Sequence, residues 1–129
     1  MRHERGTLAY FKELFELAPA AYIVTDVHCM IEDANTAAVK LLRRPLEELR
    51  GKPLTMFVEQ GERAIFHAMV TESLIALKQL VQPLTLQPVP GKQVEVLYSA
   101  SVVHDSKGSV STIHWLLIEG FEGGQGELL

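Results

Sequence analysis

The sequence predicts an α+β fold in which one antiparallel sheet carries helices on one face. Three observations lead to this prediction. Two short strands stand near the start of the chain, amphipathic helices fill its middle, and three longer strands close it. Strands and helices that are segregated along a chain are typical of antiparallel α+β domains. The 129 residues suffice for one domain with a single core.

The composition is that of an ordinary water-soluble domain. Hydrophobic residues make up 47% of the chain, charged residues make up 22%, and the net charge is −4. No basic patch suggests direct contact with nucleic acid, and no apolar run approaches the roughly 18 residues that span a membrane. The single cysteine forms no internal disulfide, and the N-terminus lacks a signal-peptide core. We therefore expect a cytoplasmic protein.

Residues 1–18 are expected to hold an amphipathic flanking helix, which Pro19 ends by disfavouring helical geometry at the preceding residue. Four apolar residues recur at helical spacing and form one stripe: Leu8, Phe11, Leu14 and Phe15. This stripe needs a cover. Two alternatives remain open, namely the sheet of the same domain and the same helix of a second copy.

A β-hairpin followed by a capped helix is predicted next. Residues 22–25 are β-branched or aromatic, and Asp26 is suited to bond the backbone of the following turn. A second strand is expected over residues 30–34. Asn35 then begins a helix over residues 36–42, because its side-chain oxygen can accept an orphan backbone N–H.

The longest helix is predicted from Glu62 to about Leu77, after a short helix over residues 45–49 and a buried turn near residues 54–58. Its buried face combines apolar and small side chains: Phe66, Met69, Val70, Ser73, Leu74 and Leu77. The same spacing directs His67 towards solvent.

Three strands close the chain. The first covers residues 84–87, and a turn over residues 88–91 leads into a hairpin of residues 94–103 and 110–118. A four-residue loop would place Tyr98 opposite Trp115 and Ala100 opposite Ile113. One hairpin face is then wholly apolar and should meet the core. The other face is apolar only at one end, which the N-terminal helix is expected to cover: Leu97, Leu116 and Ile118.

This order of elements, with five short motifs, resembles the PAS family over about residues 10–119. The motifs are the segments 14–19, 23–26, 47–52 and 114–117, together with Ile31 and Asn35 at a spacing of four. The resemblance implies a five-stranded antiparallel sheet with helices on one face over residues 19–119. It also implies a sensory or dimerisation role beside an effector, such as a histidine kinase or a transcription regulator. Residues 120–129 are then a flexible Gly-rich tail.

The chain departs from the family pattern at three places. Cys29 stands where the first turn commonly ends in glycine, and Arg43-Arg44-Pro45 replaces a glycine-containing step. The chain also reads Glu119-Gly120-Phe121 where the family often continues from its final strand into an effector helix. Output through the N-terminal helix or through a quaternary change is therefore an alternative.

The resemblance implies a pocket between sheet and helices for a small, mainly apolar molecule. Ten residues should converge there: Asn35, Phe57, Phe66, Met69, Val70, Leu84, Tyr98, Ala100, Ile113 and Trp115. The small side chains of Ala100 and Ser73 leave room for a cavity, and Asn35, Tyr98 and Trp115 offer polar groups. The alternative is a filled core in a ligand-free dimerisation module.

No motif indicates catalysis or a metal site, and we expect a protein that is not an enzyme. None of the five histidines has a ligand-like spacing to another. Haem is not expected because His67 faces solvent, and flavin is not expected because Cys29 lies in a hairpin and not on a helix. The expected partners are a second copy, through Leu8, Phe11, Leu14 and Phe15, and an effector domain or protein.

Overall fold

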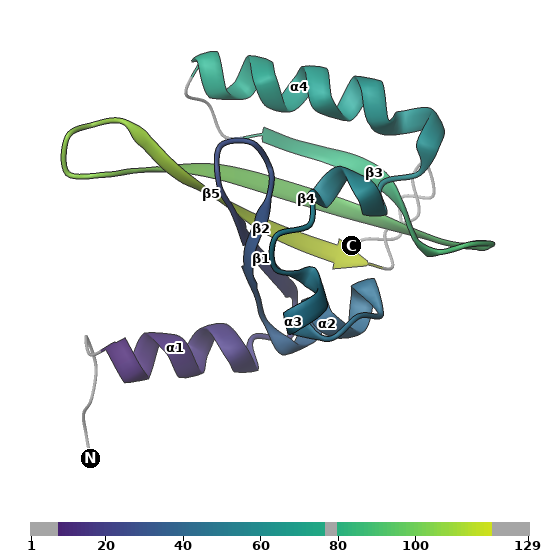
Figure 1. Cartoon of the computed structure of the whole chain (residues 1–129), viewed down its shortest axis with the longest axis horizontal. Helices are drawn as coiled ribbons and strands as arrows, with labels where there is room; N and C mark the ends of the chain where they lie inside the picture. The colour runs from purple at the N-terminus through teal and green to yellow at the C-terminus, as the bar shows by residue number, and fades with distance from the viewer. Residues whose placement is uncertain (1–7, 77–79, 120–129) are drawn as a thin grey trace, which may run out of the picture.

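The computed structural model describes residues 8–76 and 80–119, and its centre is one five-stranded antiparallel sheet (Figure 1). The elements follow in the order α1 (Leu8–Leu17), β1 (Ala21–Thr25), β2 (Ile31–Ala34), α2 (Thr36–Leu42), α3 (Leu46–Leu49), η1 (Leu54–Phe57), η2 (Gln60–Glu62), α4 (Arg63–Ala76), β3 (Leu80–Val89), β4 (Lys92–His104) and β5 (Val110–Glu119). The strand order is β2-β1-β5-β4-β3. The predicted α+β fold is therefore confirmed.

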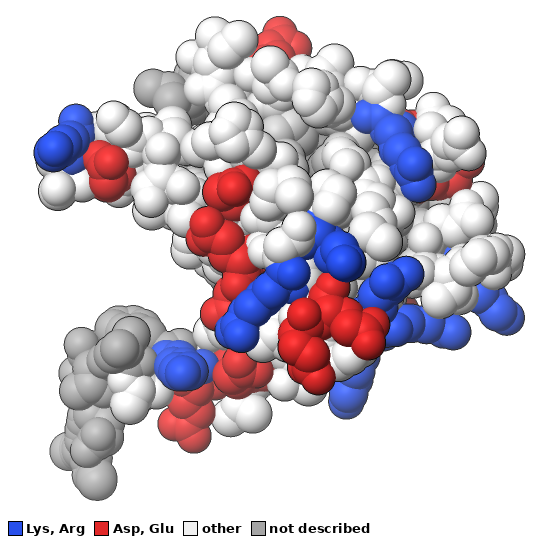
Figure 2. All heavy atoms as spheres, in the orientation of Figure 1, with Lys and Arg blue, Asp and Glu red and all other residues white. Residues whose placement is uncertain are grey.

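One face of the sheet packs on α2, α3, η1 and α4 to form a single core. In Figure 1, α4 runs above β3, whereas α2 and α3 gather at the foot of the β1–β2 hairpin. Acidic and basic side chains are intermixed over α2 and α3 in Figure 2, while the visible surface of α4 is mainly uncharged. Within residues 8–76 and 80–119, no helix has the length and apolar character needed to cross a membrane.

Two polar side chains, one in the first hairpin and one directly after it, bond the backbone as predicted. Asp26 Oδ1 accepts hydrogen bonds from the backbone N–H groups of His28 and Met30, at 2.8 and 3.0 Å. Asn35 is fully buried, and its Oδ1 accepts from the N–H of Ala38 at 3.0 Å as the N-cap of α2. These short polar side chains determine where the hairpin turns and where α2 begins.

The predicted register of the closing hairpin was wrong by two residues. Tyr98 lies opposite Leu117, and Ala100 lies opposite Trp115. The expectation assumed a four-residue loop, whereas the register shifts between Val103 and His104 beside the turn. A shift of two keeps every side chain on its own face. The predicted apolar face therefore remains the buried face of the hairpin.

β3 is longer than predicted and runs through two prolines. It extends over Leu80–Val89, so it includes Pro83 and Pro88, and Val89 still pairs with Lys92. The predicted turn over residues 88–91 therefore begins too early. Proline is tolerated here because β3 is an edge strand of the sheet, and a missing N–H can face away from β4.

α1 contacts the outer face of the sheet through Phe15 and projects away from it (Figure 1). The ring of Phe15 packs edge-on against Tyr22 at 5.2 Å between centroids. Leu14 and Leu17 remain 50% and 72% exposed, and Ile118 remains 48% exposed. The expectation that this helix covers the apolar end of the outer face is thus corrected. The side chains of Leu8 and Phe11 lie outside the described part of the chain.

Tyr22 links α1 to the last strand, and this link predicts a pH dependence. The Tyr22 hydroxyl lies 2.7 Å from His114 Nδ1, and burial lowers the pKa of His114 below its ordinary 6.5. The folded state therefore binds a proton less readily than the unfolded chain. We expect the stability that neutral His114 contributes to be complete above about pH 6.5 and to be lost as the pH falls towards its lowered pKa.

Urea unfolding at about pH 7.5 and about pH 5.5 measures this effect. His114→Gln should lose less stability between the two pH values than the unmodified chain. His28→Gln is the matched control, because His28 is an exposed histidine that lies outside the contact between Tyr22 and His114. Equal losses for the unmodified chain and His114→Gln would contradict the assignment.

Two of the departures from the family pattern fall where the backbone is left-handed. Cys29 has φ 64° and Arg43, the C-cap of α2, has φ 60°. A side chain in this region costs about 1–2 kcal/mol, which glycine avoids. Arg43 is exposed, so its replacement removes little packing.

Arg43→Gly is therefore expected to raise the free energy of unfolding by about 0.5–1 kcal/mol. Chemical denaturation measures the change. Gly51→Ala is the reverse control, because Gly51 has φ +84° with open space around the added methyl group. It should destabilise the domain by about 1 kcal/mol. A stability gain in both variants, or in neither, would show that backbone strain does not set these values.

Candidate ligand-binding site

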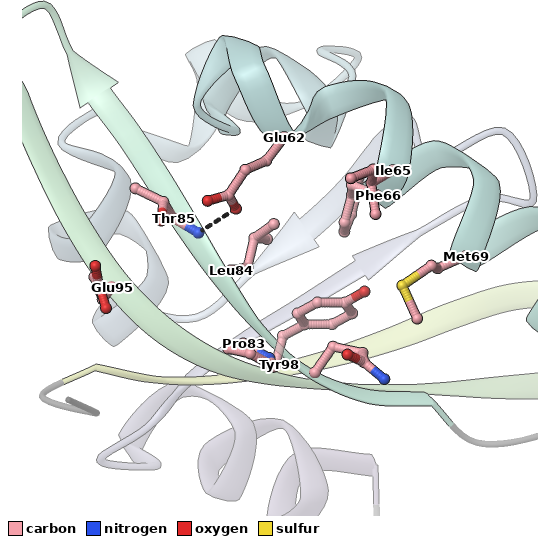
Figure 3. A pocket seen from close by; sticks show the side chains of 10 residues that line it. Glu62, Ile65, Phe66, Met69, Pro83, Leu84, Thr85, Glu95 and Tyr98 are labelled. Atoms are coloured by element: carbon pink, nitrogen blue, oxygen red, sulfur yellow. Dashed lines mark hydrogen bonds between the residues drawn. The ribbon is translucent and has the colours of Figure 1, made fainter. Parts of the chain in front are cut away.

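A cavity of about 440 Å³ lies between α4 and the strands β3 and β4 (Figure 3). This volume falls within the range of small-molecule sites, roughly 300–1,000 Å³. Its lining combines an apolar floor with carboxylate, amide and hydroxyl groups: Glu62, Ile65, Phe66, Met69, Gln82, Pro83, Leu84, Thr85, Glu95 and Tyr98.

The helix side of the cavity follows from helical spacing. Four lining residues stand at intervals of three and four along η2 and α4 and therefore share one face: Glu62, Ile65, Phe66 and Met69. The strand side comes from β3 and its neighbour β4, where Gln82 pairs with Tyr98 and Thr85 pairs with Glu95. Glu62 joins the two sides, because its Oε1 accepts a hydrogen bond from the Thr85 N–H at 2.9 Å (Figure 3).

The space deeper between sheet and helices is filled by three aromatic rings. The centroids of Phe66, Tyr98 and Trp115 lie 5.4 to 5.8 Å from one another. The gap beside Ala100 and Ser73 measures only about 10 Å³, which is about the space of one water molecule. The expected ligand cavity at that position is therefore corrected.

Two of the three polar groups expected to meet a ligand are bonded within the protein. Asn35 Nδ2 donates to the Ala20 carbonyl at 3.0 Å, and its Oδ1 also accepts from the Tyr22 N–H at 2.9 Å. Trp115 Nε1 donates to Thr25 Oγ1 at 3.0 Å. These bonds fasten the first strand to the last strand and to α2, so both residues serve the core.

Tyr98 is different. Its side chain is only 2% exposed, and its ring lies among the residues that line the cavity (Figure 3). Among residues 8–76 and 80–119, none forms a hydrogen bond with its hydroxyl group. Burial, with a smaller contribution from a Cys29 charge, raises the pKa of Tyr98 to about 12. The hydroxyl therefore stays protonated at neutral pH and presents both a donor and an acceptor to the cavity.

The structure brings four of the ten predicted residues to the cavity, namely Phe66, Met69, Leu84 and Tyr98. The other six are core residues: Asn35, Phe57, Val70, Ala100, Ile113 and Trp115. Six lining residues were not predicted from the sequence: Glu62, Ile65, Gln82, Pro83, Thr85 and Glu95. One signal was present for Glu62, which stands four residues before Phe66 and therefore shares its helical face.

The two residues weighed for cofactor chemistry lie away from the cavity lining. His67 is exposed on α4, as its helical position predicts. Cys29 is buried in the first hairpin, and burial together with the nearby Asp26 charge raises the pKa of its thiol to about 11. A thiol with so high a pKa is a weak nucleophile at neutral pH, which agrees with the predicted inert role.

The sheet order and the helices between β2 and β3, with a cavity under the last of these helices, define a class of small antiparallel α+β domains. The chain belongs to the PAS family, because the PAS fold family matches residues 9–118. This is a family of sensory and signalling modules. Comparison with curated proteins finds no match.

Solved structures of PAS domains share this fold at low sequence identity. The PAS domain of a Colwellia psychrerythraea protein has a TM-score of 0.81 at 15% identity, and the match covers 87% of this chain and 95% of that one. The PAS domain of a LuxR-family transcriptional regulator from Burkholderia thailandensis, in complex with ethanol, has a TM-score of 0.71 at 16% identity. This match covers 84% of this chain and 96% of that one. A domain of a sensory box sensor histidine kinase/response regulator from Geobacter sulfurreducens has a TM-score of 0.70 at 18% identity. This match covers 85% of this chain and 91% of that one.

Proposed function

We propose that this chain is a PAS sensory module that binds a small, mainly apolar molecule between α4 and the strands β3 and β4. It acts without catalysis in the cytoplasm, and it passes its ligand state to an effector. One observation carries the proposal, namely a cavity of about 440 Å³ lined by the buried Tyr98, whose hydroxyl is bonded by no residue within 8–76 and 80–119. The complex of the Burkholderia domain with ethanol supports ligand binding as a use of this fold.

A contiguous path of contacts leads from the cavity to the flanking helix. Phe66 lines the cavity and packs on Trp115 of β5, at 5.6 Å between ring centroids. The neighbouring residue of β5, His114, contacts Tyr22 on the outer face of the sheet, and the ring of Tyr22 packs against Phe15 of α1. A ligand that favours one position of α4 can thereby bias the position of α1. The flanking helix is thus the proposed route of output.

Native mass spectrometry of the purified chain tests the proposal. We expect a mass above that of the polypeptide, or binding of small aromatic and alcohol probes, with chemical-shift changes in Phe66, Met69 and Tyr98. His67→Gln is a useful comparison, because His67 is exposed on α4 and lies outside the cavity lining. A mass equal to that of the polypeptide alone, together with no binding of any probe, would refute the proposal.

A ligand-free dimerisation module is the second candidate, and two exposed apolar side chains of α1 favour it. Leu14 and Leu17 are 50% and 72% exposed, although both are large apolar side chains that gain by burial. In this reading a second copy of α1 covers them. Leu14→Glu should then convert a dimer into a folded monomer in analytical ultracentrifugation, whereas Lys12→Glu on the same helix should not. An unchanged oligomeric state of Leu14→Glu would exclude α1 as the dimer interface.

A further inference from the structure

We propose that the ligand of the α4–β3 cavity is a small amphipathic amine. Its ammonium group meets Glu62, its apolar body crosses Leu84 and Phe66, and a second polar group at its far end bonds the hydroxyl of Tyr98. This inference rests on the proposed function of the cavity and specifies the chemistry of the molecule that it takes.

The charge of the lining is the first argument. Among the residues that the structure describes, the lining holds two acidic residues, Glu62 and Glu95, and no lysine, arginine or histidine. The adjacent Arg63 is directed elsewhere, because its Nε donates to the Val58 carbonyl at 2.9 Å and its Nη2 to the Met56 carbonyl at 3.4 Å. Within the described ranges, neither lining carboxylate forms an ion pair. A cation is therefore the ligand charge that this lining favours.

The orientation of Glu62 is the second argument. Its side chain is half-buried, and the hydrogen bond from the Thr85 N–H holds one carboxylate oxygen against β3. A carboxylate offers about four lone-pair sites, so one backbone donor leaves most of its accepting capacity unused. An ammonium group supplies three N–H donors and no acceptor, which is the complement of this site.

The hydroxyl of Tyr98 is the independent observation that points to a ligand. A buried hydroxyl without a partner destabilises the protein unless something bonds it. Tyr98 as a residue is only 2% exposed, it lines the cavity, and no residue in the described ranges bonds its hydroxyl. The raised pKa keeps it neutral. It therefore suits a neutral polar group of the ligand, such as a hydroxyl, and not a second charge.

The two polar groups proposed to bind the ligand, those of Glu62 and Tyr98, lie beside different positions along β3. Thr85, which holds Glu62, and Gln82, which pairs with Tyr98, are three residues apart, or roughly 10 Å at the rise of a strand. Leu84 lies between them, facing Phe66 across the cavity (Figure 3). A ligand that reaches both points is polar at its two ends and apolar in its middle, with one aromatic ring or a short alkyl chain as the body.

Isothermal titration of the full chain with four matched probes tests this inference. Tyramine carries both groups, phenethylamine lacks the hydroxyl, tyrosol replaces the ammonium with a hydroxyl, and 3-(4-hydroxyphenyl)propanoate replaces it with an anion. We expect tyramine to bind most tightly, phenethylamine and tyrosol each to bind about tenfold more weakly, and the anion not to bind.

Two variants assign the binding to the proposed groups. Glu62→Gln keeps the oxygen that accepts from Thr85 but removes the charge, so it should weaken tyramine about tenfold and leave tyrosol unchanged. Tyr98→Phe keeps the ring, and should weaken tyramine but not phenethylamine. Glu72→Gln is the charge-matched control, because Glu72 is exposed on the same helix outside the cavity lining; it should change neither affinity.

The failures are distinguishable. Tyrosol that binds as tightly as tyramine, with Tyr98→Phe weakening the binding of both, would overturn the proposal of an amine ligand. It would still support the cavity as a ligand-binding site. Tyramine affinity that is unchanged in Glu62→Gln and in Tyr98→Phe would place the binding elsewhere and overturn the inference. No binding of any probe, with a bare mass in native mass spectrometry, would overturn this inference together with the proposed function.

Discussion

Replacing Asn35 with alanine is expected to lower the free energy of unfolding by about 3–4 kcal/mol. Asn35 is fully buried, and its amide makes three hydrogen bonds to backbone groups that belong to β1, to α2 and to the link before β1. Alanine removes the N-cap of α2 and leaves the Tyr22 N–H and the Ala20 carbonyl without these partners. Each unsatisfied buried group costs about 1–3 kcal/mol.

Urea denaturation followed by tryptophan fluorescence measures this loss. Thr36→Ala is the neighbouring control: Thr36 is exposed and bonds Glu16 at 3.2 Å, so its replacement should cost less than about 0.5 kcal/mol. Asn35→Asp keeps the accepting oxygen but loses the donor to Ala20, and should fall at or below the stability of Asn35→Ala. A cost near 1 kcal/mol for Asn35→Ala would mean that Asn35 acts only as a helix cap.

Replacing Trp115 with alanine is expected to lower the free energy of unfolding by about 3–5 kcal/mol. Trp115 is buried at the centre of the sheet, where its ring contacts Phe66 and Tyr98 and its Nε1 donates to Thr25 Oγ1. Alanine leaves a large void between β5 and α4, and rings packed from both sides limit how far the site can collapse. Many molecules of this variant should be unfolded at physiological temperature.

Circular dichroism is the readout, because Trp115 is the only tryptophan of the chain. Trp115→Phe keeps an aromatic ring and should cost about half as much as alanine. Leu116→Ala is the adjacent control, since Leu116 faces outward and is half-buried. A cost for Leu116→Ala that equals the cost for Trp115→Ala would contradict the assigned faces of β5.

Combining Trp115→Phe with Thr25→Val separates the hydrogen bond from ring packing. Thr25→Val alone leaves the indole N–H buried without its acceptor, whereas the double variant removes both partners. We expect the double variant to be more stable than the sum of the two single losses predicts. Strict additivity would show that the bond contributes nothing measurable.

Both predictions concern residues that were expected to touch a ligand, and the structure explains why they belong to the core. Asn35 and Trp115 have polar atoms within reach of backbone or side-chain partners. The residues proposed for the ligand lie further out, at the edge of the sheet beside β3. This separation predicts that Tyr98→Phe does not lower the stability of the domain while it alters ligand binding, because no residue in the described part of the chain bonds its hydroxyl.

Local patterns were enough to predict the elements and their faces. The alternation along the closing hairpin assigns Tyr98 and Trp115 to the same buried face. Because a strand repeats every two residues, this assignment survived a register error of two. The register itself depends on the turn at residues 105–109, where Asp105 Oδ1 accepts from the N–H groups of Lys107 and Ser109. Hydrogen bonds of this kind from Asp105 are compatible with several loop lengths, so the sequence alone did not select one.

The sequence by itself determined the order of strands and helices, the buried faces and the N-cap of α2, since each depends on neighbours within a few positions. The tertiary structure alone decided where a cavity remains. Phe66, Tyr98 and Trp115 fill the space where the ligand was expected, and the free volume lies instead between α4 and the edge strand. Volume depends on the distance between elements far apart in the chain, and residue spacing within one element carries no measure of that distance.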